Sequence, residues 1–122
     1  MEIIQRNVLK EKPKKGTALG FGRFFTDYMF TMKYTASKGW HDAKIEPNEP
    51  KSFDLATSVF HYAQGIFEGM KAFLQPDGEI AVFRPEENWA RMNRSAARMC
   101  IPQFPVETAQ EGLETLLKLE KD

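Results

Sequence analysis

Apolar positions along the chain follow two different periods, and each period predicts a kind of element. Alternation over residues 24–35 predicts a strand whose even-numbered side chains form the more apolar face. Residues 70–75 and 79–83 predict two further strands, joined as a hairpin by Pro76-Asp77-Gly78. Proline presets φ in such a turn, and glycine accepts a positive φ. These segments therefore predict antiparallel sheet.

Helical spacing predicts three more elements. Apolar residues near a 3.6-residue period predict a short helix over residues 58–68 that ends at Gly69. A second helix begins at Pro85 and runs to about Met99, with two acidic residues in its first turn. A third helix follows Pro105, and its pattern reaches the end of the chain without a stop signal, which indicates truncation. Strands and helices together predict an α+β fold.

Two segments show neither period. Residues 5–16 are polar and basic, which predicts a flexible or edge-lying arm. Residues 43–56 contain two prolines and predict short extended pieces linked by a loop. A chain of 122 residues has the size of a single domain. We therefore expect an N-terminal arm over residues 1–19 and one small domain over residues 20–122.

Charge and cysteine content exclude several classes of protein. The chain has 17 Lys and Arg against 17 Asp and Glu, which argues against a nucleic-acid binder or a basic membrane-surface protein. Its single cysteine, Cys100, allows no internal disulfide and is expected to be a buried small hydrophobe. One cysteine and two histidines argue against a metal site. Without a signal-peptide core or a membrane-spanning apolar run, a cytoplasmic protein is expected.

Three arginines of the second predicted helix form the first candidate site. The spacings of three and four residues place Arg91, Arg94 and Arg98 on one helical face. Such a face could hold a phosphate, because the planar guanidinium matches phosphate oxygens in a bidentate way. The alternative is a solvated surface with pairs such as Glu87–Arg91, and spacing alone favours this alternative.

Aromatic residues and one lysine give two weaker candidates. Tyr62 and Phe67 could line a small apolar pocket, although residue type alone favours core positions. Lys71 has apolar neighbours, and a desolvated lysine can form a Schiff base. On an alternating strand, however, Lys71 lies on the face opposite to Met70 and Ala72, so we expect it to face solvent.

Three stretches taken together resemble one family. The resemblance is carried by residues 21–29, by His61-Tyr62 with Phe67-Glu68-Gly69-Met70-Lys71-Ala72-Phe73, and by Phe83-Arg84-Pro85 followed by Arg91-Met92, Arg94-Ser95-Ala96 and Ile101-Pro102. The order and spacing of these blocks over residues 20–122 resemble the N-terminal part of a branched-chain-amino-acid aminotransferase, a fold-type-IV pyridoxal-phosphate enzyme. The resemblance implies a truncated small N-terminal domain of the class-IV aminotransferase (D-amino-acid-aminotransferase-like) fold, with an antiparallel sheet and packed helices.

The resemblance also implies site residues and a reaction. Arg91 matches the arginine that holds the phosphate of pyridoxal 5'-phosphate, and Phe21, Tyr62 and Phe67 match aromatic residues of the substrate pocket. The implied reaction passes an amino group from leucine, isoleucine or valine to 2-oxoglutarate. The full-length parent is expected to be a homodimer without nucleic-acid or membrane partners.

The family's catalytic lysine has no match in this chain. In the family, the Schiff-base lysine belongs to the larger C-terminal domain, beyond residue 122 of this sequence, and Lys71 occupies a different motif position. The 122 residues alone are therefore expected to be inactive. The alternatives are another fold-type-IV enzyme (a D-amino-acid transaminase or aminodeoxychorismate lyase) and a non-catalytic binding or dimerisation fragment.

Overall fold

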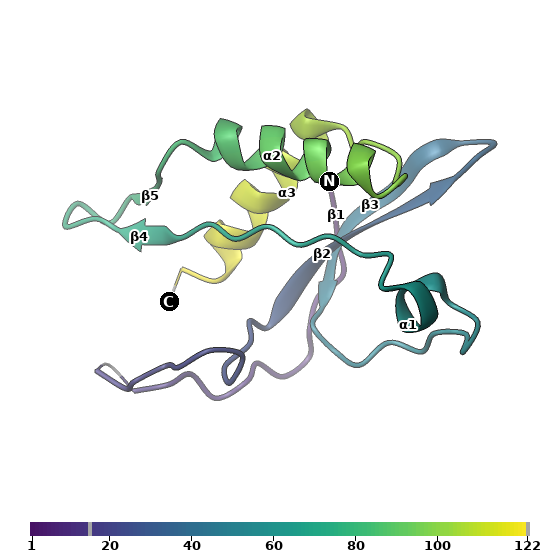
Figure 1. Ribbon diagram of the computed structural model, residues 1–122. Helices are drawn as coiled ribbons and strands as arrows, with labels where there is room; N and C mark the ends of the chain where they lie inside the picture. Colours follow the sequence, from purple (N-terminus) through teal and green to yellow (C-terminus); the bar gives the residue numbers. More distant parts are fainter. Residues whose placement is uncertain (15, 122) are drawn as a thin grey trace. The chain divides into compact units, whose positions relative to one another are not determined.

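The computed structural model describes residues 1–14 and 16–121 (Figure 1). The chain divides into two compact units. Unit 1 holds the described residues of Met1–Glu49 and Gln110–Asp122, and unit 2 holds Pro50–Ala109. The helix α3 (Val106–Leu119) passes from unit 2 into unit 1. The mixture of small sheets and helices confirms the predicted α+β composition.

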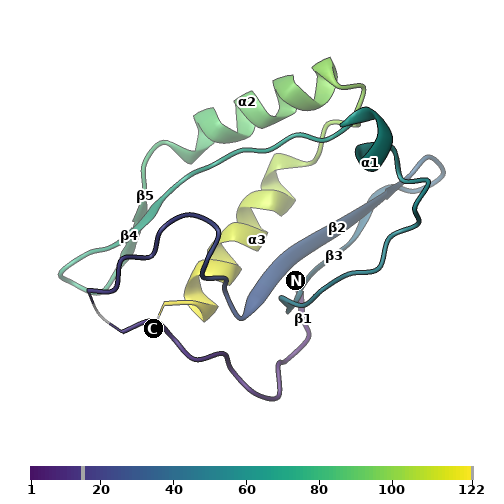
Figure 2. The same ribbon diagram turned by 60° about the horizontal axis from the view of Figure 1, so that its bottom comes forward.

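Unit 1 is built on a three-stranded sheet with the order β1-β3-β2. The strands β2 (Tyr28–Thr35) and β3 (Gly39–Pro47) pair antiparallel as a long hairpin, visible in two views (Figure 1, Figure 2). The short β1 (Glu2–Ile3) pairs parallel with β3, so the sheet is not purely antiparallel. Ile45 of β3 is fully buried and forms the centre of this core.

The hairpin corrects two sequence predictions. The strand predicted from residue 24 begins only at Tyr28, and Phe24 and Phe25 are exposed. Residues 43–47, predicted as separate extended pieces, are part of the continuous strand β3. Pairing with β2 explains the continuity, because ladder hydrogen bonds compensate for the weak strand pattern of β3.

Close packing of α3 on β2 requires a glycine inside the helix. A Cβ at Gly112 would lie only 2.6 Å from Cδ2 of the Phe30 ring. No side chain larger than hydrogen fits there without displacing the ring. Gly112 therefore allows the part of α3 in unit 1 to approach the sheet closely.

A buried carboxylate holds the N-terminal arm. Asp27 is 2% exposed and accepts a hydrogen bond of 2.6 Å from the backbone N–H of Lys10. The Nζ of Lys12 lies 3.2 Å from Asp27 and 3.3 Å from Glu120, just after α3. Of the two alternatives for residues 5–16, these contacts and the edge strand β1 favour an edge-lying arm; Lys15 lies outside the described residues.

Asp27→Asn is expected to lower the thermal midpoint of the protein, chiefly near neutral pH. The Lys10 N–H and, secondarily, Lys12 lower the pKa of Asp27 below its ordinary value. A lowered pKa stabilises the fold above the unfolded value of about 4, and this stability is lost as the pH falls through the folded pKa. Thermal midpoints measured from neutral to acidic pH should therefore depend less on pH in Asp27→Asn.

The control for Asp27→Asn is Asp42→Asn in the same unit. Asp42 is 54% exposed and pairs with Lys33 and His41. Exposed pairs contribute little to stability, so this variant should change the midpoint much less. Equal changes in the two variants would contradict a special role for the buried carboxylate.

Unit 2 contains the predicted hairpin. The strands β4 (Ala72–Leu74) and β5 (Ile80–Val82) pair antiparallel, each shorter than predicted, and Gly78 in the turn has φ +83°. The helix α2 (Pro85–Arg98) begins and ends as the sequence predicts, and α3 follows Pro105 as expected. The core of this unit includes Ala96 and Phe104.

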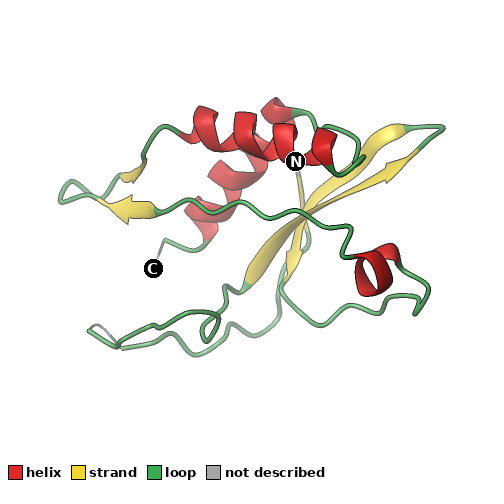
Figure 3. Ribbon diagram, in the orientation of Figure 1, coloured by secondary structure: helices red, strands yellow, loops and turns green. Residues whose placement is uncertain are grey.

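The helix predicted over residues 58–68 is much shorter than expected. The helix α1 (Ser58–Tyr62) ends where Ala63 adopts a left-handed conformation, and the chain runs on as a loop to β4 (Figure 3). Side chains of α2 hold this loop: Asn88 donates to the carbonyl of Gly69 at 2.9 Å, and Arg91 pairs with Glu68. These tertiary contacts outweigh the helical pattern of five apolar residues.

Cys100 is exposed, which contradicts the expectation of a buried thiol. It follows α2 with φ +55°, and its N–H donates to the carbonyl of Ala97 while the Ile101 N–H donates to that of Ala96. This is the hydrogen-bond pattern of a Schellman motif, in which the left-handed position is usually glycine. The hydrogen bonds that end α2, and not packing of the thiol, therefore determine where Cys100 lies.

Candidate functional site

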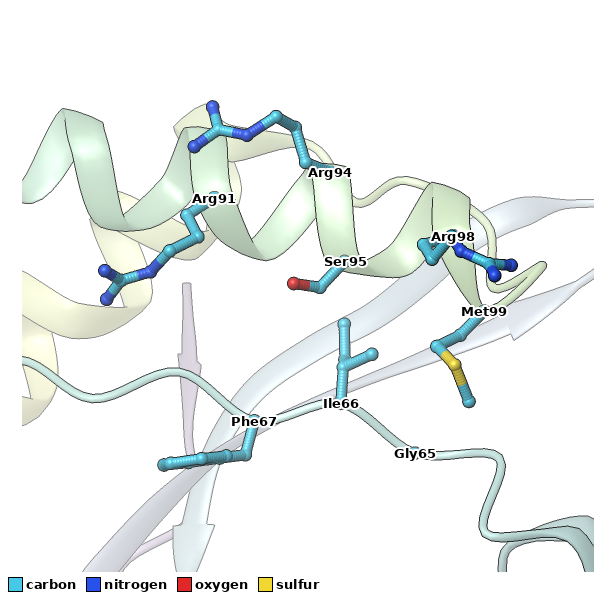
Figure 4. Close-up of a pocket in the computed structure, with 8 residues that line it drawn as sticks. All are labelled: Gly65, Ile66, Phe67, Arg91, Arg94, Ser95, Arg98 and Met99. Atoms are coloured by element: carbon cyan, nitrogen blue, oxygen red, sulfur yellow. The ribbon is translucent and has the colours of Figure 1, made fainter.

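A cavity of about 500 Å³ lies in unit 2 between α2 and the segment Gly65–Phe67 (Figure 4). Arg91 and Arg98 extend from α2 on either side of Ser95, and Arg94 extends along the helix side away from Phe67 (Figure 4). The lining residues are Gly65, Ile66, Phe67, Arg91, Arg94, Ser95, Arg98 and Met99. The cavity therefore combines an apolar wall with the side chains of Arg91 and Arg98, while the guanidinium of Arg94 extends away from Phe67.

The geometry of Arg91 is set by Glu68. The Nε of Arg91 donates to Oε2 of Glu68 at 2.6 Å, and the Nη2 donates to Oε1 of the same carboxylate. Glu68 also accepts hydrogen bonds from Asn88 Nδ2 at 3.1 Å and from the Gly69 N–H at 3.0 Å. Arg91, and to a smaller extent Asn88 and Gly69, lower the pKa of Glu68 to about 2. The carboxylate is therefore ionised throughout the neutral pH range.

The observed pairing replaces the surface pair expected from helical spacing. Glu87 pairs with Arg84 at 2.9 Å, and Arg91 pairs with Glu68. The expectation of a Glu87–Arg91 pair is therefore wrong. The side chain of Glu68 is 6% exposed, whereas that of Arg91 is 61% exposed. One edge of the guanidinium therefore binds a nearly buried carboxylate while the remainder reaches solvent.

The cavity carries net positive charge. Arg91 uses Nε and one N–H of Nη2 toward Glu68, which leaves three N–H groups, two on Nη1 and one on Nη2, outside this pair. Among the ion pairs of residues 1–14 and 16–121, none involves Arg94 or Arg98. Arginine N–H groups in this arrangement suit a phosphate or another multidentate anion.

The cavity brings together only two of the four site residues expected from the sequence. Phe67 lines it beside Arg91 and is 86% exposed. Tyr62, 81% exposed at the end of α1, is not among the lining residues. Phe21 belongs to unit 1 and is 98% exposed. None of the three aromatic residues is in a core, so the core alternative for Tyr62 and Phe67 is wrong.

Sequence reasoning missed the residues that organise the site. Glu68 binds Arg91, Asn88 donates to Glu68, and Ser95 directs its hydroxyl between Arg91 and Arg98 (Figure 4). Glu68 and Arg91 are 23 positions apart, so no local spacing pairs them. The only available signal is that each lies inside one of the motif blocks that carry the family resemblance.

Other features bear on the class of site. Lys71 is exposed, as expected, and does not line the cavity. Within the described part of the chain, no group of three or more His, Cys, Asp or Glu side chains could hold a metal ion. In the same residues, no helix has the length and apolarity needed to cross a membrane.

Comparison with curated proteins finds similarity to aminotransferases. The chain is 49% identical over 113 residues to branched-chain-amino-acid aminotransferase 2 of Bacillus subtilis (strain 168), which covers 92% of this chain. It is 47% identical over 122 residues to a probable branched-chain-amino-acid aminotransferase of Staphylococcus aureus (strain N315), which covers the whole chain. A probable branched-chain-amino-acid aminotransferase of Streptomyces coelicolor is 52% identical over 98 residues, or 80% of this chain. No protein-family model matches the chain.

These similarities confirm the family expected from the motifs. By its sequence the chain is similar to proteins named branched-chain-amino-acid aminotransferases over 80% to 100% of its own length. The matches cover 31%, 34% and 27% of the three relatives, so the chain spans about a third of the length of the proteins it matches. This share is consistent with an N-terminal portion.

Proposed function

We propose that this chain is the small-domain part of a pyridoxal-phosphate-dependent branched-chain aminotransferase. The observation that carries the proposal is the cavity, where Arg91 presents a free guanidinium edge beside Phe67. The identity of 45% to 52% with relatives of that name supports the same activity. In this proposal residues 20–122 form the incomplete small domain of the class-IV aminotransferase fold, and residues 1–19 form its arm.

The residues of the cavity fit the phosphate group of the cofactor. Arg91 would hold the phosphate through its outer edge. Ser95 and Arg98 line the same cavity, so the hydroxyl of Ser95 would add a hydrogen-bond donor and Arg98 would add positive charge. Glu68 does not oppose this as a free charge, because its carboxylate is already saturated by Arg91, Asn88 and Gly69. When bound, pyridoxal phosphate supplies the electron sink for amino transfer.

The aromatic residues fit a substrate pocket for branched side chains. Phe21, Tyr62 and Phe67 are large apolar groups that face solvent in this chain. Burial of a leucine, isoleucine or valine side chain against such walls contributes about 1.5–3 kcal/mol. We propose that further parts of the parent protein complete these walls, and that the parent is a homodimer that transfers amino groups from these amino acids to 2-oxoglutarate.

The sequence of the gene beyond codon 122 tests this proposal most directly. We expect an open reading frame that encodes a second domain with a lysine able to form the Schiff base. The protein encoded by that frame should produce glutamate from leucine and 2-oxoglutarate. A stop codon directly after residue 122 would favour a non-catalytic binding fragment. Activity with D-amino acids in place of leucine would favour another fold-type-IV enzyme.

A further inference from the structure

We propose that Glu68 is a positioning residue for phosphate binding: it grips one edge of Arg91 and thereby presents the opposite edge to the anion. This inference rests on the proposed role of Arg91 in holding the cofactor phosphate. A carboxylate beside a phosphate site normally repels the ligand, because both groups are negatively charged. The residue type of Glu68 alone would therefore not suggest that it assists phosphate binding.

The surroundings of Glu68 show that its carboxylate is fixed before any ligand arrives. Its side chain is 6% exposed and accepts four hydrogen bonds, two from Arg91 and one each from Asn88 Nδ2 and the Gly69 N–H. Asn88 also donates to the carbonyl of Gly69 at 2.9 Å. Asn88 and Arg91 lie three residues apart on α2, so two adjacent side chains of one helix bind the same two-residue segment. The carboxylate is therefore an anchored part of the loop.

Anchoring matters because arginine is flexible. A solvent-exposed arginine samples many rotamers, and binding a ligand through it costs the entropy of restricting them. The two hydrogen bonds from Nε and Nη2 restrict these rotamers in the free protein. They leave the other edge, with two N–H groups of Nη1 and one of Nη2, for a bidentate contact with phosphate oxygens.

The charge of Glu68 does not cancel the attraction of the site for an anion. Arg98 also lines the cavity, and Arg94 adds a further positive charge on the same helix, although its guanidinium extends away from Phe67. The pair also persists over the pH range in which phosphate binds as a dianion, since the pKa of Glu68 is about 2 and that of Arg91 is raised above its ordinary value. Positioning by Glu68 is therefore constant and does not switch with pH.

The experiment compares the binding of pyridoxamine 5'-phosphate and pyridoxamine to the chain by calorimetry. Pyridoxamine lacks the phosphate, and neither probe carries an aldehyde that would react with surface lysines. In Glu68→Gln we expect the affinity for the phosphorylated probe to fall about 3- to 10-fold, from the entropy of one freed side chain. The affinity for pyridoxamine should stay unchanged. In the background of Arg91→Ala, Glu68→Gln should have no further effect.

Two additional variants complete the design. Glu87→Gln removes a carboxylate from the exposed pair with Arg84 on the same helix and should change neither affinity. Asn88→Ala keeps the Glu68–Arg91 pair but removes one anchor of the carboxylate, so it should lower the phosphate preference by a smaller factor. If the thermal midpoint of Glu68→Gln shows that this variant does not fold, Asn88→Ala still tests the inference.

The possible outcomes separate this inference from the proposed function. Equal losses for the two probes would mean that Glu68 is only structural, and an unchanged or tighter binding of the phosphorylated probe would mean that its carboxylate competes with phosphate. Either result overturns the inference while Arg91 keeps its role. If Arg91→Ala binds the phosphorylated probe as tightly as the unmodified chain, the proposed phosphate clamp fails and the inference fails with it.

Discussion

Arg91→Ala is expected to weaken binding of the phosphorylated cofactor about 10- to 150-fold. A dianionic phosphate and a guanidinium form charge-assisted hydrogen bonds worth about 1.5–3 kcal/mol. At ~1.4 kcal/mol per decade of affinity, their loss gives this range. Arg91→Lys should recover only part of the affinity, because an ammonium group cannot form the bidentate contact.

The matched variants for this prediction lie on α2 or, for Arg84, directly before its first residue. Arg84→Ala removes an exposed arginine outside the cavity and serves as the control for charge alone. Arg94→Ala and Arg98→Ala truncate two lining arginines that have no partner comparable to Glu68 in the described residues, so each should cost much less. Affinity measured by calorimetry for each variant decides the question. A loss in Arg94→Ala or Arg98→Ala equal to that in Arg91→Ala would mean that the whole face binds the phosphate.

The second large effect concerns catalysis by these 122 residues alone. Incubated with leucine, 2-oxoglutarate and pyridoxal phosphate, the chain is expected to produce glutamate no faster than the cofactor in buffer. Its lysines include only Lys71 in a family motif, and Lys71 is exposed and outside the cavity. An exposed lysine lacks the desolvating pocket or neighbouring cation that activates a Schiff-base nucleophile.

The variant Lys71→Ala tests whether Lys71 is responsible for any activity that the chain shows. If the chain shows turnover above background and Lys71→Ala abolishes it, then the assignment of Lys71 to a solvent-facing motif position is wrong. Turnover that survives Lys71→Ala would show that a different lysine of the chain forms the Schiff base. Release of glutamate, followed over time at several concentrations of the chain, distinguishes both cases from the cofactor's own slow reaction.

The site was only partly predictable because its members come from distant segments. The spacing of Arg91, Arg94 and Arg98 placed them on one face of α2, and the structure shows all three at one cavity. Spacing alone favoured a solvated surface, however, since it offers only neighbours on the same helix, such as Glu87, as partners. Motif identity pointed to Arg91, but the partner that orients it, Glu68, became apparent only in the folded chain.

The sequence by itself determined the elements whose signals are local. Pro85 and the acidic residues after it begin α2, and Pro76-Asp77-Gly78 forms the turn between β4 and β5, because backbone preferences of proline and glycine act within a few residues. The motif blocks likewise pointed to the relatives that the comparison finds, because a motif is read from residue identities and needs no knowledge of their contacts.

Tertiary contacts alone decided where patterns stop and how the site is arranged. The helix predicted to Glu68 ends at Tyr62 because hydrogen bonds from α2 hold the next residues in an extended loop. The strand predicted from residue 24 begins at Tyr28, next to Asp27 and its bonds to the arm. Such contacts join positions that are 17 or more residues apart. Local propensities of a few tenths of a kcal/mol per residue do not outweigh the hydrogen bonds to the carboxylates of Asp27 and Glu68, so the long-range contacts prevail.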